Sequence, residues 1–260
     1  MTKQWCKSTV SKTEAEGNKN ESLPSMIVFD LDDCLWTPEM HELYDMPSIP
    51  VQGNLNPDHD GTSNKNKQER PNRAGKRKLH SNSSNCSSGP KSSESVAVSI
   101  HVTAAPDEIG TVGMRVPGTS QTVFLFDGAR RALREIATDA KYNNVIIAAA
   151  SSSLEPTYSH QCLNNIEIVQ GVTMRDLFQY DEIGRVGPLT SSKTTHFQSL
   201  HRKSHVPYEE MLFFDDCNWG DHVQDVQDAF GVIGQRTPNG LQIEEFYTGL
   251  EKFHKSVQEL

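Results

Sequence analysis

The sequence lacks any apolar run near the length of a membrane span, and it has few hydrophobic residues overall. Hydrophobic residues make up 35% of the 260 residues, and the mean hydropathy is -0.58. Both values are low for a compact domain of this length, and a bilayer-spanning helix needs about 20 consecutive apolar residues. We therefore expect no membrane association, and we expect part of the chain to lie outside the hydrophobic core.

Cysteine is also scarce and poorly spaced for cross-linking. The five cysteines are an odd number, lie far apart and form no C-x-x-C pair. This usage favours a reduced, cytoplasmic protein and argues against a zinc site. The first 25 residues are polar and mixed in charge, without the apolar segment of a secretory signal. We expect residues 1–24 to be a flexible N-terminal tail.

Residues 61–105 account for much of the missing hydrophobicity. They are rich in Ser, Asn, Lys, Arg and Pro and show no period of 2 or 3.6, which predicts a disordered insert. The net charge of the whole chain is -9, which argues against general nucleic-acid binding, yet the insert carries eight basic and two acidic residues. Its basic run 65–78 is typical of a nuclear-import signal or a patch for an anionic partner, although a solvated loop is the simpler interpretation.

Outside the insert, short apolar strands alternate with helical segments. Such alternation predicts an α/β, Rossmann-like fold: a parallel sheet covered by helices on both faces, formed by one domain from residue 25 to residue 260. Residues 122–126 are expected to close a small flap, which follows the first strand and carries the insert. The expected strands are 26–29, 143–150, 177–183, 210–216 and 232–234, and the expected helices are 128–142, 156–169, 193–205, 221–231 and 241–257.

Polar residues follow three of these expected strands. Asp30 and Asp32 follow the first strand, Ser151 follows the second, and Asp216 ends a later one. Because ligands of such sheets bind beyond the carboxyl ends of the strands, we expect these side chains to meet at one edge. Converging carboxylates need a cation, and oxygen ligands favour Mg²⁺. With Lys193 at the start of the next helix, this composition is typical of a phosphoryl-transfer site.

The segments "FDLDDCLW", "AAASS", "SKTTHF" and "FFDD" resemble the four motifs of the haloacid dehalogenase superfamily. More narrowly, they resemble the eukaryotic magnesium-dependent, acid phosphatase-like family, from residue 26 to the C-terminus except for the insert. The resemblance implies a Mg²⁺-dependent phosphomonoesterase that works through an aspartyl-phosphate. It also implies substrates of the phosphotyrosine type, with protein tyrosine phosphatase activity, or small sugar phosphates.

The resemblance also implies a role for each matching residue. Asp30 would be the nucleophile, and Asp32 would protonate the leaving group and then activate water. Mg²⁺ would be held by Asp30, the backbone carbonyl of Asp32 and Asp216. The substrate-binding residues would be Ser151, Ser152 and Lys193. Asp215 would hold metal-bound water or Lys193.

Departures from the family pattern leave alternatives open. Cys34 stands where the family has Thr, Ser152 stands where it has Arg, and the segment "CNWGDH" after Asp216 is unlike the family. A catalytically weak or inactive scaffold, using its basic insert for interactions, is the alternative function. The enzyme is favoured because four residues are intact: Asp30, Asp32, Lys193 and Asp216. Its only expected partner is a phosphorylated substrate. We also expect a monomer.

Overall fold

The computed structural model describes residues 22–56 and 108–259. The predicted insert 61–105, its basic run and all but the last three residues of the predicted tail 1–24 lie outside the described residues. Within them, no helix is both long enough and apolar enough to cross a membrane.

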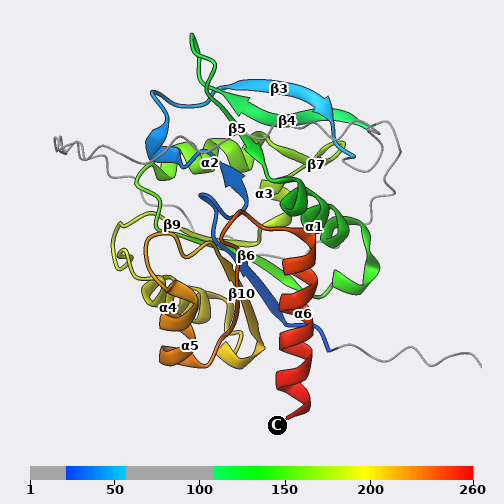
Figure 1. Cartoon of the computed structure of the whole chain (residues 1–260), viewed down its shortest axis with the longest axis vertical. Helices are drawn as coiled ribbons and strands as arrows, with labels where there is room; N and C mark the ends of the chain where they lie inside the picture. The colour runs from blue at the N-terminus through cyan, green and yellow to red at the C-terminus, as the bar shows by residue number, and fades with distance from the viewer. Residues whose placement is uncertain (1–21, 57–107, 260) are drawn as a thin grey trace, which may run out of the picture.

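A parallel sheet of five strands forms the centre of the molecule (Figure 1), in the order β11-β10-β1-β6-β9. β1 lies at the centre of the sheet, between β10 and β6. Its Phe29 is opposite Phe214 of β10 and Ala149 of β6. This confirms the predicted fold class. The strands are β1 (Met26–Phe29), β6 (Ile146–Ser151), β9 (Tyr180–Ile183), β10 (Met211–Asp215) and β11 (Ile233–Arg236).

Alternate side chains of β1 enter two different cores. Ile27 and Phe29 belong to one hydrophobic cluster, which includes residues of α1 and α6, while Met26 and Val28 belong to another with residues of α4 and α5. Both faces of the sheet are therefore buried, which explains why β1 is apolar at every position. The main helices are α1 (Asp127–Thr138), α2 (Pro156–Asn165), α4 (Lys193–Ser204), α5 (His222–Phe230) and α6 (Ile243–Gln258).

A smaller antiparallel sheet, in the order β2-β5-β4-β3, forms the flap and lies at the top of Figure 1. Trp36 on β2 is fully buried and pairs with Leu125 of β5. β3 and β4 form a hairpin whose connection is residues 55–108, so the insert falls within the flap, as predicted. The flap strands are β2 (Trp36–Thr37), β3 (Ile49–Asn54), β4 (Ile109–Arg115) and β5 (Thr122–Leu125).

Two predicted helices were too long. The expected helix 128–142 ends at Thr138 and is followed by a short 3-10 helix, Ala140–Tyr142. The expected helix 156–169 ends at Asn165, and Glu167–Val169 form β7, which pairs with β8 (Val172–Thr173). The residues after Asn165 alternate in polarity as Ile-Glu-Ile-Val, and tertiary pairing favours the strand. The expected strand 177–183 also begins later, at Tyr180, because Leu177 ends the short helix α3 (Met174–Leu177).

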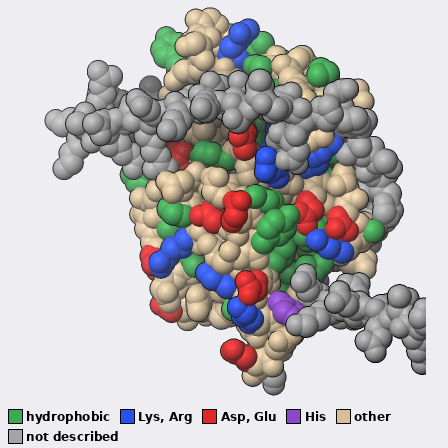
Figure 2. Space-filling model, turned by 45° about the vertical axis from the view of Figure 1, so that its right-hand side comes forward, with side chains coloured by type: hydrophobic (Ala, Val, Ile, Leu, Met, Phe, Trp, Pro, Cys, Tyr) green, Lys and Arg blue, Asp and Glu red, His purple; other side chains and the backbone are tan. Residues whose placement is uncertain are grey.

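Charged side chains of both signs are interspersed on the face shown in Figure 2, around a group of exposed hydrophobic side chains. That face therefore carries no continuous patch of one sign of charge.

Candidate active site

Asp30 lies directly after β1, at the carboxyl edge of the sheet. Its backbone N–H donates to the Phe214 carbonyl at 2.8 Å, so the parallel ladder with β10 fixes its position. The whole residue is only 7% exposed. Burial raises the pKa of the Asp30 carboxyl to about 6, even though Lys193 opposes the rise. A buried carboxylate at a sheet edge is costly, and the cost is offset by its cation.

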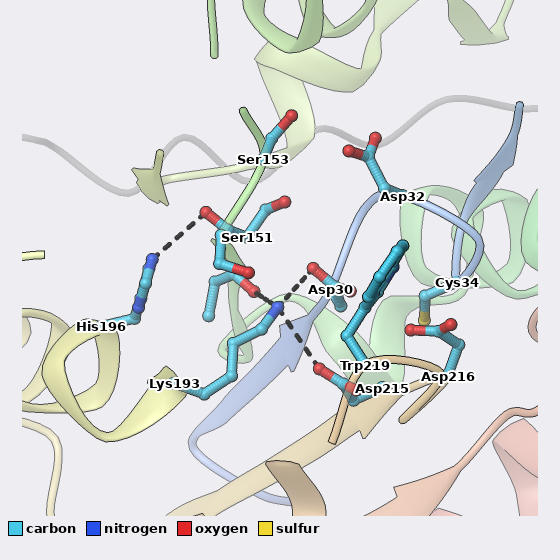
Figure 3. A network of polar contacts seen from close by, with 12 residues as sticks. Asp30, Asp32, Cys34, Ser151, Ser153, Lys193, His196, Asp215, Asp216 and Trp219 are labelled. Carbon is cyan, nitrogen blue, oxygen red and sulfur yellow. Dashed lines mark hydrogen bonds and ion pairs between the residues drawn. The ribbon is translucent and has the colours of Figure 1, made fainter. Parts of the chain in front are cut away.

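Lys193 is the buried cation of the site (Figure 3). Its Nζ donates to Asp30 Oδ1 at 2.5 Å and to the Ala150 carbonyl at 2.7 Å, and it lies 3.3 Å from Asp215 Oδ2. Burial alone would lower the pKa of this ammonium, but the charges of Asp30 and Asp215 outweigh burial and raise it. Lys193 therefore stays charged and ties α4 to the ends of three strands.

Three carboxylates meet beside Lys193. One oxygen from each of Asp30, Asp215 and Asp216 lies within 4.8 Å of the others, and all three residues are buried. Asp215 Oδ2 has no hydrogen-bond partner. Burial, together with the charges of Asp30 and Asp215, raises the pKa of Asp216 to about 8. One lysine therefore does not neutralise the cluster.

These residues fit a hard divalent cation. The cluster offers only carboxylate oxygens, which suit Mg²⁺ rather than a metal that prefers nitrogen or sulfur. Of the predicted metal ligands, Asp30 and Asp216 are brought together, and Asp215 joins them. The side chain of Asp32 lies outside this group. The ligand predicted at Asp32 was its backbone carbonyl.

Asp32 occupies a different environment from Asp30. Its Oδ1 accepts from the indole Nε1 of Trp36 at 2.8 Å, and the nearby Ser153 side chain and Met40 backbone also favour its charged form. Burial raises the pKa of Asp32 to about 6, and the charge of Glu39 adds to the rise. No lysine or arginine neutralises this carboxyl within the described residues, so it can keep a proton in mildly acidic solution.

The end of β6 is held by His196. The imidazole Nε2 lies 3.2 Å from the Ser151 carbonyl and 3.1 Å from the Gly184 carbonyl, so this nitrogen carries the hydrogen and donates to both. Burial and the nearby Lys193 lower the pKa of His196 to about 4, which keeps the ring neutral at pH 7. Ser151 is thereby fixed close to Lys193 (Figure 3).

Ser152, the other predicted substrate-binding serine, is placed differently. It is half-buried, and its carbonyl accepts from Arg185 Nε at 3.1 Å. The next residue, Ser153, is buried, and its side chain favours the charged form of Asp32. Because side chains alternate along an extended chain, Ser151 and Ser153 point to the same side.

Cys34, which stands where the family has Thr, is fully buried. Its Sγ accepts from the Thr237 hydroxyl at 3.4 Å and lies 3.7 Å from the Phe214 carbonyl. Burial raises the pKa of the thiol well above its ordinary value. A protonated, enclosed thiol is a poor nucleophile, so Cys34 packs in the core rather than reacts.

The segment after Asp216 crosses the mouth of the site. The Trp219 indole Nε1 donates to the Glu39 carboxylate at 3.0 and 3.1 Å, and Glu39 follows β2. Sequence reasoning missed Glu39, Trp219, His196 and Ser153. The motif "SKTTHF" contains His196, but only the long-range contacts reveal what these four side chains hold in place.

Comparisons with known proteins assign the chain to a protein family. Residues 98–256 match the model of a family described as acid phosphatase. The chain belongs to this family. The match begins after Asp30 and Asp32, which the central sheet brings to the same edge as the matched residues. The resemblance inferred from the motifs is confirmed.

Two curated relatives agree with the assignment. Magnesium-dependent phosphatase 1 of Homo sapiens is 33% identical over 109 residues, which are 42% of this chain and 54% of the relative. A HAD-like hydrolase superfamily protein of Schizosaccharomyces pombe is 28% identical over 81 residues, 31% of this chain and 46% of the relative. The chain thus spans about half the length of the curated relatives it matches.

Solved structures show only distant likeness. A haloacid dehalogenase-like hydrolase of Streptococcus pneumoniae has a TM-score of 0.34 at 11% identity, covering 50% of this chain and 53% of that one. A predicted phosphatase from Clostridium acetobutylicum has a TM-score of 0.35 at 14% identity, covering 53% of this chain and 62% of that one. The fold assignment therefore rests on the strand order itself.

Proposed function

We propose that this protein is a Mg²⁺-dependent phosphomonoesterase that uses Asp30 as its nucleophile. The observation that supports this most directly is the Asp30 carboxylate, held at 2.5 Å by Lys193 within a buried cluster of three acids. A structural ion pair would need only one acid for one lysine. Here the excess negative charge requires a cation, and phosphoryl transfer uses both the cation and the carboxylate.

In the first step, Asp30 attacks phosphorus and the ester oxygen leaves. Lys193 orients the attacking carboxylate and neutralises charge on the phosphoryl oxygens, and Ser151 lies beside it to contact the phosphate. Asp32 protonates the departing alcohol, which leaves Asp30 as an aspartyl-phosphate. In the second step, Asp32 removes a proton from water, which attacks the same phosphorus and releases inorganic phosphate.

The surroundings of Asp32 suit this double role. A general acid and base works best when its pKa lies near the working pH, and the pKa of Asp32 is raised to about 6 by burial. Trp36 holds the carboxyl in place through its indole N–H. Asp30 differs from Asp32 in its partner: Lys193 donates to Asp30 Oδ1 at 2.5 Å and opposes the rise in pKa that burial causes.

Asp30, Asp215 and Asp216, with the Asp32 carbonyl, would hold the Mg²⁺. When bound, the ion neutralises charge on the transferring phosphoryl group. The relative from Homo sapiens is named a magnesium-dependent phosphatase, and that name supports the same metal here. For the substrate we propose a phosphate ester of phosphotyrosine type or a small sugar phosphate.

Trapping the phosphorylated protein tests this proposal. The full chain is mixed with 4-nitrophenyl phosphate and Mg²⁺, quenched in acid, digested and analysed by mass spectrometry. We expect a labile phosphate on the peptide containing Asp30, and no label on the Asp30→Asn variant. Label on another residue would overturn the mechanism, and hydrolysis that survives thorough EDTA treatment would overturn the metal requirement.

A further inference from the structure

Trp219 is unusual among the large side chains near the site because it is exposed. Its exposed fraction is 67%, although its Nε1 is bonded to the buried Glu39. His41 packs edge-on against the indole, with the ring centroids 6.1 Å apart and the planes at 69°. The indole is thus fixed in orientation while much of its surface stays in contact with solvent.

The chain before Trp219 is fixed as well. The Cys217 N–H donates to Asp215 Oδ1 at 2.8 Å, and the Asn218 N–H donates to Asp216 Oδ2 at 3.2 Å. The Asn218 side chain reaches Asp33 at 3.3 Å. These bonds join Trp219 to the carboxylate cluster on one side, and Glu39 joins it to the flap on the other.

The position of Glu39 relates Trp219 to the leaving group. In an in-line displacement at phosphorus, the leaving oxygen departs on the side away from the attacking oxygen of Asp30, and Asp32 must reach it. Asp32 Oδ1 is bonded to Trp36 Nε1 at 2.8 Å, three residues before Glu39, and the charge of Glu39 reaches the Asp32 carboxyl. A group attached to the leaving oxygen beside Asp32 would therefore extend toward Glu39, the residue that anchors Trp219.

The chemistry of this rim is aromatic rather than charged. Glu39 is 4% exposed, and its carboxylate is already bonded to Trp219 and paired with His41 at 3.0 Å. Of the two bonded residues, Trp219 is therefore the one that is exposed. Figure 3 shows Trp219 among the acids of the site. A flat aromatic group stacks on an indole face and gains more from that contact than a short alkyl group does.

We propose that Trp219 is a specificity-determining residue that stacks against the leaving group and selects aryl over alkyl phosphate esters. This inference rests on the proposed function and narrows its substrate class. Glu39 is the positioning residue, since it holds the indole in place through Nε1 without touching the substrate. Trp219 stands in the segment "CNWGDH", so the selection is a property of this chain's own rim.

The test compares phenyl phosphate with ethyl phosphate as substrates of the full-length protein in Mg²⁺. We expect Trp219→Ala to lower the aryl-to-alkyl ratio of kcat/KM by about 3- to 10-fold, the range expected from aromatic stacking. Trp219→Phe keeps a ring and should fall between wild type and Ala. Tyr247→Ala, at another exposed aromatic residue on α6, is the matched control and should leave the ratio unchanged.

Non-hydrolysable analogues give a second measurement that does not depend on turnover. Phenylphosphonate should inhibit the wild type more strongly than methylphosphonate does, and Trp219→Ala should remove most of this preference. If Trp219→Ala lowers both substrates equally and leaves the inhibitor preference intact, Trp219 is only structural and the inference is wrong. If the wild type hydrolyses neither ester, the proposed function itself is wrong, and the inference fails with it.

Discussion

The carboxyl end of the central sheet and the flap above it differ in what they bury. The sheet end buries charge: Asp30, Lys193, Asp215 and Asp216 are all less than a tenth exposed. The flap buries mainly apolar side chains such as Trp36, and its buried acids, Glu39 and Glu108, flank its strands rather than lie within them. Burying charge requires matched partners at fixed distances, whereas an apolar sheet tolerates variation in length and sequence.

This difference predicts where a substitution has the largest effect on activity. At the sheet end, one altered atom leaves a buried charge without its partner or removes a reacting group. At the flap and rim, a change alters which esters fit while the reacting groups stay in place. The effects expected below therefore decrease with distance from Asp30.

The largest effect is expected at Asp30. Asp30→Asn replaces the attacking oxygen by an amide nitrogen while keeping the shape, so turnover should fall by about 10⁴-fold or more. Steady-state release of phosphate from 4-nitrophenyl phosphate measures this, and circular dichroism checks that the variant is folded. A folded Asp30→Asn variant with nearly normal turnover would show that another residue attacks.

Asp32→Asn should cost less and depend on the substrate. It keeps the nucleophile but removes the acid and base, which are worth about 10²–10⁴-fold. The rate of the first step should fall less for 4-nitrophenyl phosphate than for an alkyl ester, because nitrophenolate leaves without a proton. Burst kinetics separate the two steps. An equal loss for both esters in the first step would argue against Asp32 as the acid.

Much of this sheet end could be predicted from the sequence. Asp30, Ser151 and Asp216 follow apolar runs, and parallel strands bring such positions to one edge, so their convergence with Lys193 was expected. The contacts between Trp219 and Glu39 were not, because they join residues far apart in the sequence, through a loop and a flap without periodic pattern. β3 was missed for a related reason: Pro50 and Gly53 weaken its strand signal, and only pairing with β4 reveals it.

Asp216 is expected to affect stability as well as activity. In the metal-free protein, burial raises the pKa of Asp216 to about 8, whereas an unfolded Asp titrates near pH 3.9. The folded state therefore binds more protons between these values, and this carboxyl destabilises the fold increasingly as pH rises through that window. Asp216→Asn should stabilise the EDTA-treated protein by roughly 1–2 kcal/mol at pH 7.5 and by less at pH 5.5.

Differential scanning calorimetry measures this effect. Mg²⁺ should raise the Tm of the wild type at pH 7.5, and raise that of Asp216→Asn much less. Asp225→Asn, at an exposed position on α5 with its side chain 60% exposed, controls for the loss of one negative charge. A variant that is no more stable than wild type in EDTA, at either pH, would show that the acid cluster carries no excess charge.

The smallest effect is expected from replacing residues 57–107 by a short turn. Leu55 N–H donates to the Glu108 carbonyl at 2.8 Å, and Asn54 pairs with Ile109, so the two ends of this segment already meet. A short connection can therefore close the hairpin of β3 and β4. The sequence 61–105 also lacks the apolar residues that a core requires.

We expect turnover within about twofold of wild type and a Tm within about 5 °C, since shortening a loop changes closure entropy only slightly. A version of the full chain with residues 61–105 in scrambled order is the matched control, because it keeps length and charge. If the shortened protein is inactive while the scrambled one works, length matters. If both lose activity, the sequence of the insert contributes to the site. The expectation that changes in the flap leave the reacting groups in place would then be wrong.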